Sequence, residues 1–463
     1  MSSGGQEQPA AGGAEDPQPR RFVGQKSAAD AASGQAGPVV VKGAAAPRRV
    51  VRNVIPPEIL ENDALNRAIS VLPRNYNFEV HKTVWRIQQS NAKRVALQFP
   101  EGLLLYSNVI ADIVETFTQA EHVFVMGDVT YGACCVDDFS AEALGADILV
   151  HYGHSCLVPV NVTSVPCVYI FVEIKMDVGH LVASIRHNFK PGTKILIAGT
   201  IQFSSSIQAA RRELEQDYPS VAIPQCKPLS PGEILGCTSP VVAGGAEALI
   251  FVADGRFHLE SFMIANPSIP AYRYDPYNRK MTSESYDQAG MRGARRGAIE
   301  AARLAGRWAV VLGTLGRQGN PRVMETVTAA LERAGKEYVE VLLSEVTPDK
   351  LRAFGDAFGA YVQIACPRLS IDWGEGFAAP TLTPYEALVA LGEVPEWWGD
   401  DAPKDEATGL PQYPMDYYSR EGGSWSSSYI RAADRPARRR PQAPPAQGCA
   451  CAAGGESRAA PCR

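Results

Sequence analysis

One supersecondary pattern occurs three times in this chain, and it constrains the fold more than any other sequence feature. A short apolar run is followed by a turn rich in Gly, Pro or Ser and then by a helical pattern. The first apolar runs begin near residues 94, 194 and 308, so the repeat is about 100 to 115 residues long and each unit is large enough to be a domain. Strands that alternate with helices form largely parallel sheets. We therefore predict an α/β protein with three similar parallel-sheet, Rossmann-like domains in a pseudo-threefold arrangement.

The limits of these domains follow from where the pattern starts and stops. Residues 1–52 are rich in Gly, Ala, Pro, Gln and Ser without apolar periodicity, which predicts a disordered tail. Residues 403–463 are similar in composition, and we predict that they are mostly disordered. The three domains are expected at 53–185, 186–300 and 301–402, with an amphipathic helix around Ile59 to Leu72 near the start of the first.

Length and composition exclude several classes of protein. A chain of 463 residues with 45% hydrophobic residues buries a large core, and its formal charge of −5 argues against a general nucleic-acid binder. The apolar runs break after a few residues, so no membrane span is expected, and the N-terminus lacks the features of a signal peptide. A reducing cytoplasm is therefore the expected compartment.

Ten cysteines are too sparse for a disulfide framework, but three of them follow the repeat. Cys134 comes after the second apolar run of the first unit, Cys237 ends a loop of the second unit, and Cys366 comes after an apolar run of the third. Ligands bind beyond the carboxyl ends of parallel strands, so these positions suit three domains that converge on one centre.

The number of cysteines limits what such a centre would hold. Three thiolates without an evident fourth ligand do not suit a structural zinc site, which normally has four protein ligands. They suit a 4Fe-4S cluster in which one iron is free to bind a substrate or cofactor. Three unrelated core cysteines are the alternative interpretation, and the spacing by itself favours that alternative over a cluster.

Two further loops are candidates for binding. Glycines recur every third residue in 313–319, between an apolar run and a helical pattern, where backbone N–H groups receive a carboxylate or phosphate; a tight turn without ligand is the alternative. Asp254, Arg256 and His258 follow another apolar run, and they suit either a binding site or a salt bridge with a turn.

The other histidines and cysteines of interest are expected to be structural. We expect hydrogen-bonding roles for His151 and His154. Four cysteines without counterparts in the other units are predicted to be packed thiols: Cys135, Cys156, Cys167 and Cys226. Three tail cysteines are either metal-binding or accidental thiols: Cys449, Cys451 and Cys462.

Six motifs resemble those of the diphthamide biosynthesis family, and the resemblance covers essentially all of residues 53–400. The motifs are Tyr131–Cys134, Tyr152–Cys156, Leu235–Thr238, Asp254–His258, Gly313–Gly319 and Ala365–Gly374. The adjacent cysteines at 134 and 135 and the long flanking tails look like the eukaryotic subunit 1 branch of that family.

This resemblance implies an atypical radical SAM enzyme, a 2-(3-amino-3-carboxypropyl)histidine synthase. In such an enzyme Cys134, Cys237 and Cys366 would hold a 4Fe-4S cluster. A 3-amino-3-carboxypropyl radical from S-adenosylmethionine would add to the imidazole C2 of a histidine in translation elongation factor 2, the first step towards diphthamide. A homologous subunit 2 as heterodimer partner and a small metal-binding electron-donor protein are also implied. The candidate contacts to S-adenosylmethionine are Gly255, Arg256, Gly316, Arg317, Gln318 and Asp372.

Two functions from other classes remain as alternatives. A quinolinate-synthase-like enzyme has a similar three-domain, three-cysteine plan with an open iron, although the motifs match the diphthamide family better. A non-catalytic subunit would use its cluster only to relay electrons, although the presence of all three cysteines favours the catalytic role. Formation of methylthioadenosine from S-adenosylmethionine distinguishes the proposed enzyme from the quinolinate-synthase-like one. Cys237→Ser in an otherwise intact heterodimer tests the non-catalytic alternative, because full residual activity would contradict the catalytic role.

Overall fold

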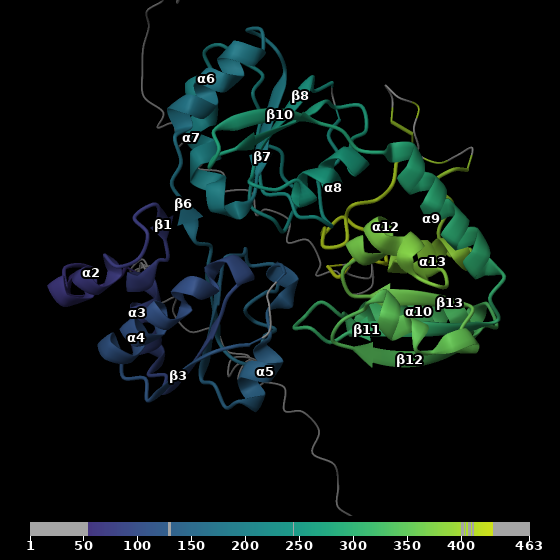
Figure 1. Cartoon of the computed structure of the whole chain (residues 1–463), viewed down its shortest axis with the longest axis horizontal. Coiled ribbons are helices and arrows are strands. Elements are labelled where there is room, and N and C mark those ends of the chain that lie inside the picture. Colours follow the sequence, from purple (N-terminus) through teal and green to yellow (C-terminus); the bar gives the residue numbers. More distant parts are fainter. Residues whose placement is uncertain are drawn as a thin grey trace, which may run out of the picture. The chain divides into compact units, whose positions relative to one another are not determined.

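Three four-stranded sheets, each with its own helices, make up the fold (Figure 1). The computed structural model describes residues 54–127, 131–243, 245–399, 402, 404–405, 409 and 412–428, and from residue 55 these belong to one compact unit. The α/β class and the three sheets confirm the prediction. Each sheet falls within one predicted domain range, whereas the domain limits stay a prediction and residues 1–52 lie outside the described part.

The first sheet is parallel throughout, in the order β3-β2-β4-β5. Its strands are β2 (Arg94–Gln98), β3 (His122–Val125), β4 (Ile148–Tyr152) and β5 (Cys167–Ile170). Its helical elements are α1 (Pro57–Leu60), α2 (Asp63–Ile69), α3 (Val80–Ser90), η1 (Glu101–Tyr106), α4 (Ser107–Phe117), η2 (Ala133–Cys135) and α5 (Asp138–Ala143). A separate two-stranded antiparallel pair joins β1 (Tyr76–Asn77) to β6 (Glu173–Ile174).

The second sheet has the order β10-β9-β8-β7 and one antiparallel edge strand. Its strands are β7 (Ile195–Gly199), β8 (Ala248–Val252), β9 (Ala271–Asp275) and β10 (Lys280–Glu284). Its helical elements are α6 (Val178–Asn188), η3 (Ile201–Phe203), α7 (Ser204–Leu214) and α8 (Phe257–Ala265). Since β10 pairs with β9 as a hairpin, this sheet is mixed where the repeat predicted parallel pairing.

The third sheet is parallel, in the order β12-β11-β13-β14. Its strands are β11 (Arg307–Gly313), β12 (Glu337–Leu343), β13 (Ala360–Ile364) and β14 (Thr381–Leu382). Its helical elements are α9 (Gln288–Arg303), α10 (Pro321–Arg333), α11 (Pro348–Arg352), η4 (Gly355–Ala357), α12 (Arg368–Trp373), η5 (Gly374–Gly376) and α13 (Pro384–Ala390). None of the helices in the described ranges is long and apolar enough to cross a bilayer.

The central strands are covered on both faces, as their near-continuous apolar sequences require. In β2, Val95 and Leu97 join the apolar cluster on one side, while Ala96 joins a different cluster on the other. In β11, Trp308 and Val311 likewise belong to different clusters. Side chains alternate across a strand, so each sheet is held by helices and loops on both faces, and its strand ends are left as places to build a site.

Two segments differ from the sequence-based expectation. The helix predicted around Ile59 to Leu72 is two helices, because the Asn62 side chain accepts a hydrogen bond from the backbone N–H of Leu65 and so caps a new helix. Residues 412–428 were assigned to the mostly disordered tail, but Tyr413, Met415, Tyr417 and Tyr418 in this segment are buried. Below, 412–428 is called the C-terminal segment.

Candidate functional site

The three repeat cysteines meet at one cavity of about 520 Å³. Cys134 lies in η2 after β3, Cys237 lies in the loop between α7 and β8, and Cys366 lies two residues after the end of β13. The rest of the wall is largely apolar, with a few polar side chains. The lining side chains used below are Tyr131, Leu157, Leu235, Phe257, His258, Gln318, Glu345, Val346, Arg368, Asp372 and Trp373. Cysteines more than 100 residues apart in the chain are thus brought to one place.

The loop of the first sheet is fixed from two sides. The backbone carbonyl of Cys134 accepts a hydrogen bond of 3.0 Å from the Arg317 N–H of the third sheet. The next carbonyl, that of Cys135, accepts one of 2.8 Å from the buried Gln98 side chain at the end of β2. Both contacts hold the short helix η2, and therefore the direction in which Cys134 presents its thiol.

Arg368 links the other two cysteine loops. It follows Cys366 by two residues, and its guanidinium donates to the backbone carbonyls of Gly236 (3.2 Å) and Phe257 (2.7 Å). The same group forms ion pairs with Glu260 and Asp372 and lies 4.4 Å from the centroid of the Phe257 ring. Since this Arg is only 3% exposed, the Cys366 loop and the Cys237 loop are held together by a satisfied buried charge.

The three thiols are neutral in the protein by itself. Burial raises the pKa of Cys237 to about 12 and that of Cys366 to about 11. For Cys134, a hydrogen bond with Cys135 is the largest cause, followed by burial and the neighbouring thiols, and its pKa lies well above the ordinary range. Because metals bind thiolates, loading such a site must displace protons.

The donor set fits an iron–sulfur cluster better than a single ion. Among the described residues, no three His, Cys, Asp or Glu side chains are close enough to hold one metal ion together. The three cysteines nevertheless share one cavity, and each thiol influences the pKa of Cys134. Three soft donors around a space wider than one ion are what a cluster with one iron free of cysteine requires.

Asp138 of α5 and Arg317 of the loop after β11 form an ion pair between the first and third sheet regions. Two hydrogen bonds of 2.6 and 2.7 Å join them, and the Asp138 side chain is fully buried. Burial by itself would raise the pKa of Asp138, but hydrogen bonds from Arg317 and Ser164 outweigh it, and the pKa is lowered below 3.8. The pair stabilises the fold and holds the backbone N–H that contacts Cys134.

We expect Asp138→Asn to reduce the free energy of unfolding at pH 7 by about 2–3 kcal/mol, since it removes a charge-assisted buried contact. A carboxyl whose pKa is depressed on folding contributes stability above its unfolded pKa and loses it as pH falls through the folded value. The difference between wild type and variant should therefore shrink below about pH 4. Urea unfolding at pH 7 and pH 3 measures it, with Asp349→Asn, in an exposed pair, as the control. A pH-independent difference would contradict the prediction.

Gly316 lies where the glycine-rich loop touches the loop of the first sheet. It has φ +53°, and a Cβ there would meet the backbone carbonyls of Cys135 and Val136. Only glycine combines a left-handed backbone with this close approach. The loop therefore serves as a tight contact between sheets, one residue before the Arg317 N–H that bonds Cys134.

Gly316→Ala is expected to be more destabilising than Gly335→Ala. Both glycines are left-handed, so each variant carries about 1–2 kcal/mol of backbone strain, but Gly335 faces open space. The overpacking at Gly316 adds about 1–3 kcal/mol. Equal shifts of the two variants in urea unfolding midpoints would show that the contact at Gly316 is unimportant.

Known proteins similar to this chain share its length and arrangement. Residues 99–403 match a family model described as "Putative diphthamide synthesis protein". The 2-(3-amino-3-carboxypropyl)histidine synthase subunit 1 of Gallus gallus is 54% identical over 402 residues, which is 86% of this chain and 93% of that protein. Its Homo sapiens counterpart is 53% identical, over 87% of this chain and 88% of that protein. The chain belongs to the diphthamide synthesis family. It is a transferase.

A solved member of this family has the same fold. Dph2 from Pyrococcus horikoshii in a structure with a 4Fe-4S cluster superposes with a TM-score of 0.58 and 26% sequence identity, over 74% of this chain and 97% of that protein. Another structure of the same protein gives a TM-score of 0.59 with 27% identity, over 74% and 98%. The family match favours the diphthamide interpretation over the quinolinate-synthase-like alternative.

The candidate contacts to S-adenosylmethionine divide into two groups. Gln318 and Asp372 line the cavity with the cysteines. The side chains of the other candidates do not line this cavity. Arg317 forms an ion pair with Asp138, and the half-exposed Arg256 forms ion pairs with Glu260 and Glu284. The last two candidates, Gly255 and Gly316, have no side chain. The ion pairs show that the two arginines have structural partners, as the salt-bridge interpretation of Arg256 expected.

The histidines mostly follow expectation. His151 hydrogen-bonds Gln98 at 2.8 Å and His154 at 3.2 Å, as predicted for structural residues. His258 borders the cavity, and its Nδ1 is buried without a hydrogen-bond partner in the described part of the chain. Burial lowers the pKa of His258 to about 4, so its imidazole is neutral at pH 7.

The remaining cysteines include one wrong prediction. Cys135, Cys167 and Cys226 are buried, as expected of packed thiols, but Cys156 is exposed. It lies in the loop after β4, where its neighbours Ser155 and Leu157 are buried and Cys156 alone is exposed between them. The three tail cysteines lie outside the described residues: Cys449, Cys451 and Cys462.

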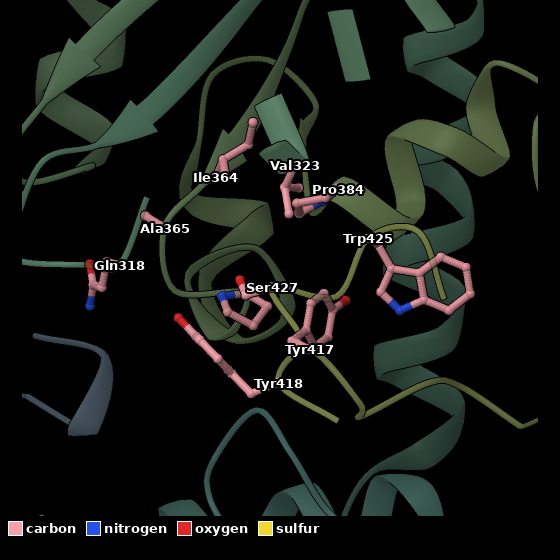
Figure 2. A pocket seen from close by; sticks show the side chains of 10 residues that line it. Gln318, Val323, Ile364, Ala365, Pro384, Tyr417, Tyr418, Trp425 and Ser427 are labelled. Atoms are coloured by element: carbon pink, nitrogen blue, oxygen red, sulfur yellow. The ribbon is translucent and has the colours of Figure 1, made fainter. Parts of the chain in front are cut away.

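A second, small pocket of about 20 Å³ adjoins the cysteine site, with room for one water (Figure 2). Gln318 and Ala365 line both pockets, and Tyr417, Tyr418 and Trp425 come from the C-terminal segment. The sequence analysis did not predict that these aromatic side chains are buried, because the surrounding stretch is rich in Ser, Gly and Pro and was expected to be mostly disordered. The spacing of aromatics in 413–425 is the one signal that separates this stretch from the rest of the tail.

Proposed function

We propose that this chain is the catalytic subunit that transfers the 3-amino-3-carboxypropyl group of S-adenosylmethionine to a histidine of translation elongation factor 2. The observation that carries the proposal is the convergence of Cys134, Cys237 and Cys366, one from each sheet region, on one cavity. The names and titles of the relatives support the same activity and the same cofactor.

In this proposal the three thiolates hold a 4Fe-4S cluster. When bound, such a cluster supplies one electron and an open iron site, by which the bond between sulfur and the γ-carbon of the methionine part is cleaved. Overall, that carbon–sulfur bond breaks, methylthioadenosine leaves, a bond to the imidazole C2 forms and the C2 proton is released. The electron is returned, so the transfer is redox-neutral.

The chain's own residues bind, orient and shield the reactants. Leu157, Leu235 and Val346 present apolar surface that keeps water from a reactive intermediate. Gln318 and Asp372 are the polar groups we propose for orienting S-adenosylmethionine, since they border the same cavity. Arg368 positions the Cys366 and Cys237 loops relative to each other.

The partners in this proposal are a homologous subunit 2, a small metal-binding electron-donor protein and elongation factor 2, all in the cytoplasm. The relatives' name, subunit 1, supports a multi-subunit enzyme. Domains 53–185, 186–300 and 301–402 are proposed as the three structural units, each supplying one cysteine.

Anaerobic purification with the homologous subunit tests this function. Iron counting and EPR should show a 4Fe-4S cluster, and addition of S-adenosylmethionine, reductant and elongation factor 2 should yield methylthioadenosine and a heavier elongation factor. Absence of the cluster would overturn the proposal. A cluster that is reduced and reoxidised without consuming S-adenosylmethionine would instead assign the electron-relay role.

A further inference from the structure

Three aromatic residues that line the cysteine cavity are also exposed to solvent. Tyr131 is 66% exposed, Phe257 is 44% exposed and Trp373 is 61% exposed, whereas Leu157 of the same wall is buried. A residue that both lines a cavity and faces solvent lies at the opening of that cavity. Below, Tyr131, Phe257 and Trp373 are called the aromatic rim.

The aromatic rim has one member from each sheet region, and each member lies beside a cysteine loop. Tyr131 comes just before η2, which carries the first cysteine. Trp373 ends α12, the helix that follows the third cysteine. Phe257 begins α8, and its ring lies so close to Gly236, just before the second cysteine, that a Cβ on this glycine would overlap it. The rim is therefore arranged around the same centre as the three cysteines.

The acidic residues of the cavity wall are paired within the chain. Asp372 forms an ion pair with Arg368, and the exposed Glu345 forms one with Lys350. The guanidinium of Arg368 also lies 4.4 Å from the centroid of the Phe257 ring, which fixes this ring before any ligand binds. A side chain that is already fixed loses little conformational entropy on binding. The opening therefore offers a partner mainly aromatic surface.

Such a surface suits a protein better than a small molecule. Clustered exposed apolar residues mark binding surfaces, and Trp, Tyr and Phe are enriched in protein–protein interfaces. In the proposed function the acceptor is a histidine of a protein. A cavity of about 520 Å³ has the size of a small-molecule site, so a folded protein stays outside it and only the acceptor side chain enters. The polypeptide around that histidine then lies across the opening.

We propose that the aromatic rim is the docking surface for the polypeptide segment that carries the acceptor histidine. The inference rests on the proposed function and adds the part of this chain that recognises the protein substrate. The histidine reaches into the cavity, while apolar side chains next to it in the protein substrate pack on the three rings. The rim contributes to binding of the protein substrate and not to binding of S-adenosylmethionine.

Trp373→Ala and Tyr131→Ala test this inference in the heterodimer with the homologous subunit; Phe257 is left unchanged because it also contacts Arg368. Each variant should bind elongation factor 2 about tenfold more weakly in biolayer interferometry, as expected when an aromatic anchor of an interface is truncated. The KM for the elongation factor should rise by the same factor at unchanged kcat, and the Kd of S-adenosylmethionine should stay the same. Tyr277→Ala is the matched control, because Tyr277 is 50% exposed but does not line the cavity.

Wild-type affinity for the elongation factor in both variants, or an equal loss in Tyr277→Ala, would overturn the inference and leave the proposed function intact. Weaker binding of S-adenosylmethionine would assign the rim to the small substrate, and loss of the heterodimer in size-exclusion chromatography would assign it to the subunit contact. Either result also overturns the inference. A wild-type heterodimer that neither binds nor modifies the elongation factor would overturn the proposed function itself.

Discussion

Cys237→Ser is expected to abolish transfer to elongation factor 2 and to remove the iron–sulfur signal, with activity reduced by at least about a hundredfold. A serine hydroxyl is a hard, poorly acidic ligand, whereas iron in clusters is held by soft thiolates. Two cysteines would remain, too few to hold a cluster between three parts of the chain. Iron counting, EPR and the mass of the elongation factor measure the outcome.

Cys226→Ser is the matched control for this variant. Cys226 is a buried thiol of the same sheet region, but it does not line the cavity. It should keep both iron and activity, with at most a modest loss of stability. Full transfer activity in Cys237→Ser, with the control behaving as wild type, would contradict the assignment of the three cysteines.

Of the variants proposed for stability, Arg295→Ala is expected to lower the free energy of unfolding most, by about 3–5 kcal/mol. Arg295 of α9 forms two hydrogen bonds of 2.7 Å with Glu386 of α13, and their side chains are only 2% and 0% exposed. Burial by itself would lower the pKa of Arg295, but the facing carboxylate outweighs it and raises the pKa. Removing the arginine leaves a buried carboxylate with an uncompensated charge.

Arg307→Ala provides the comparison, because Arg307 also forms two hydrogen bonds, to Glu337, but on the surface. Exposed pairs contribute about 0–1 kcal/mol, so this variant should unfold at nearly the wild-type urea concentration. Similar losses in the two variants would mean that the burial of the Arg295 pair does not determine its contribution.

Local sequence signals predicted the elements close to the site well. The apolar runs at 94, 194 and 308 became β2, β7 and β11, because a buried parallel strand needs a continuous apolar sequence. Cys134 and Cys366 follow strands as predicted, because the end of each apolar run in the sequence marks the end of a strand. Their convergence on one cavity was inferred from the repeat, and it is what the structure shows.

Local sequence patterns did not predict the contacts between residues that are far apart in the chain. Arg317 was a candidate for binding S-adenosylmethionine, yet its partner Asp138 lies 179 positions away and no local pattern links them. The same holds for Tyr418, whose backbone partner Thr238 is 180 positions away. The composition of the C-terminal segment predicted disorder. Its burial depends on surfaces that other regions of the chain form, and composition does not show these.

The C-terminal segment pairs with the Cys237 loop, since the Tyr417 N–H donates to the Cys237 carbonyl and the Tyr418 N–H donates to the Thr238 hydroxyl. This pairing determines when the site is complete during synthesis. All three sheets are translated before residues 412–428 emerge from the ribosome, and until then the carbonyl of Cys237 and the hydroxyl of Thr238 lack these partners. Cluster loading, in the proposed enzyme, therefore belongs after translation rather than during it. A stop codon just after residue 402 would therefore remove both the partners of the Cys237 loop and the tyrosines that complete the core beside the third sheet.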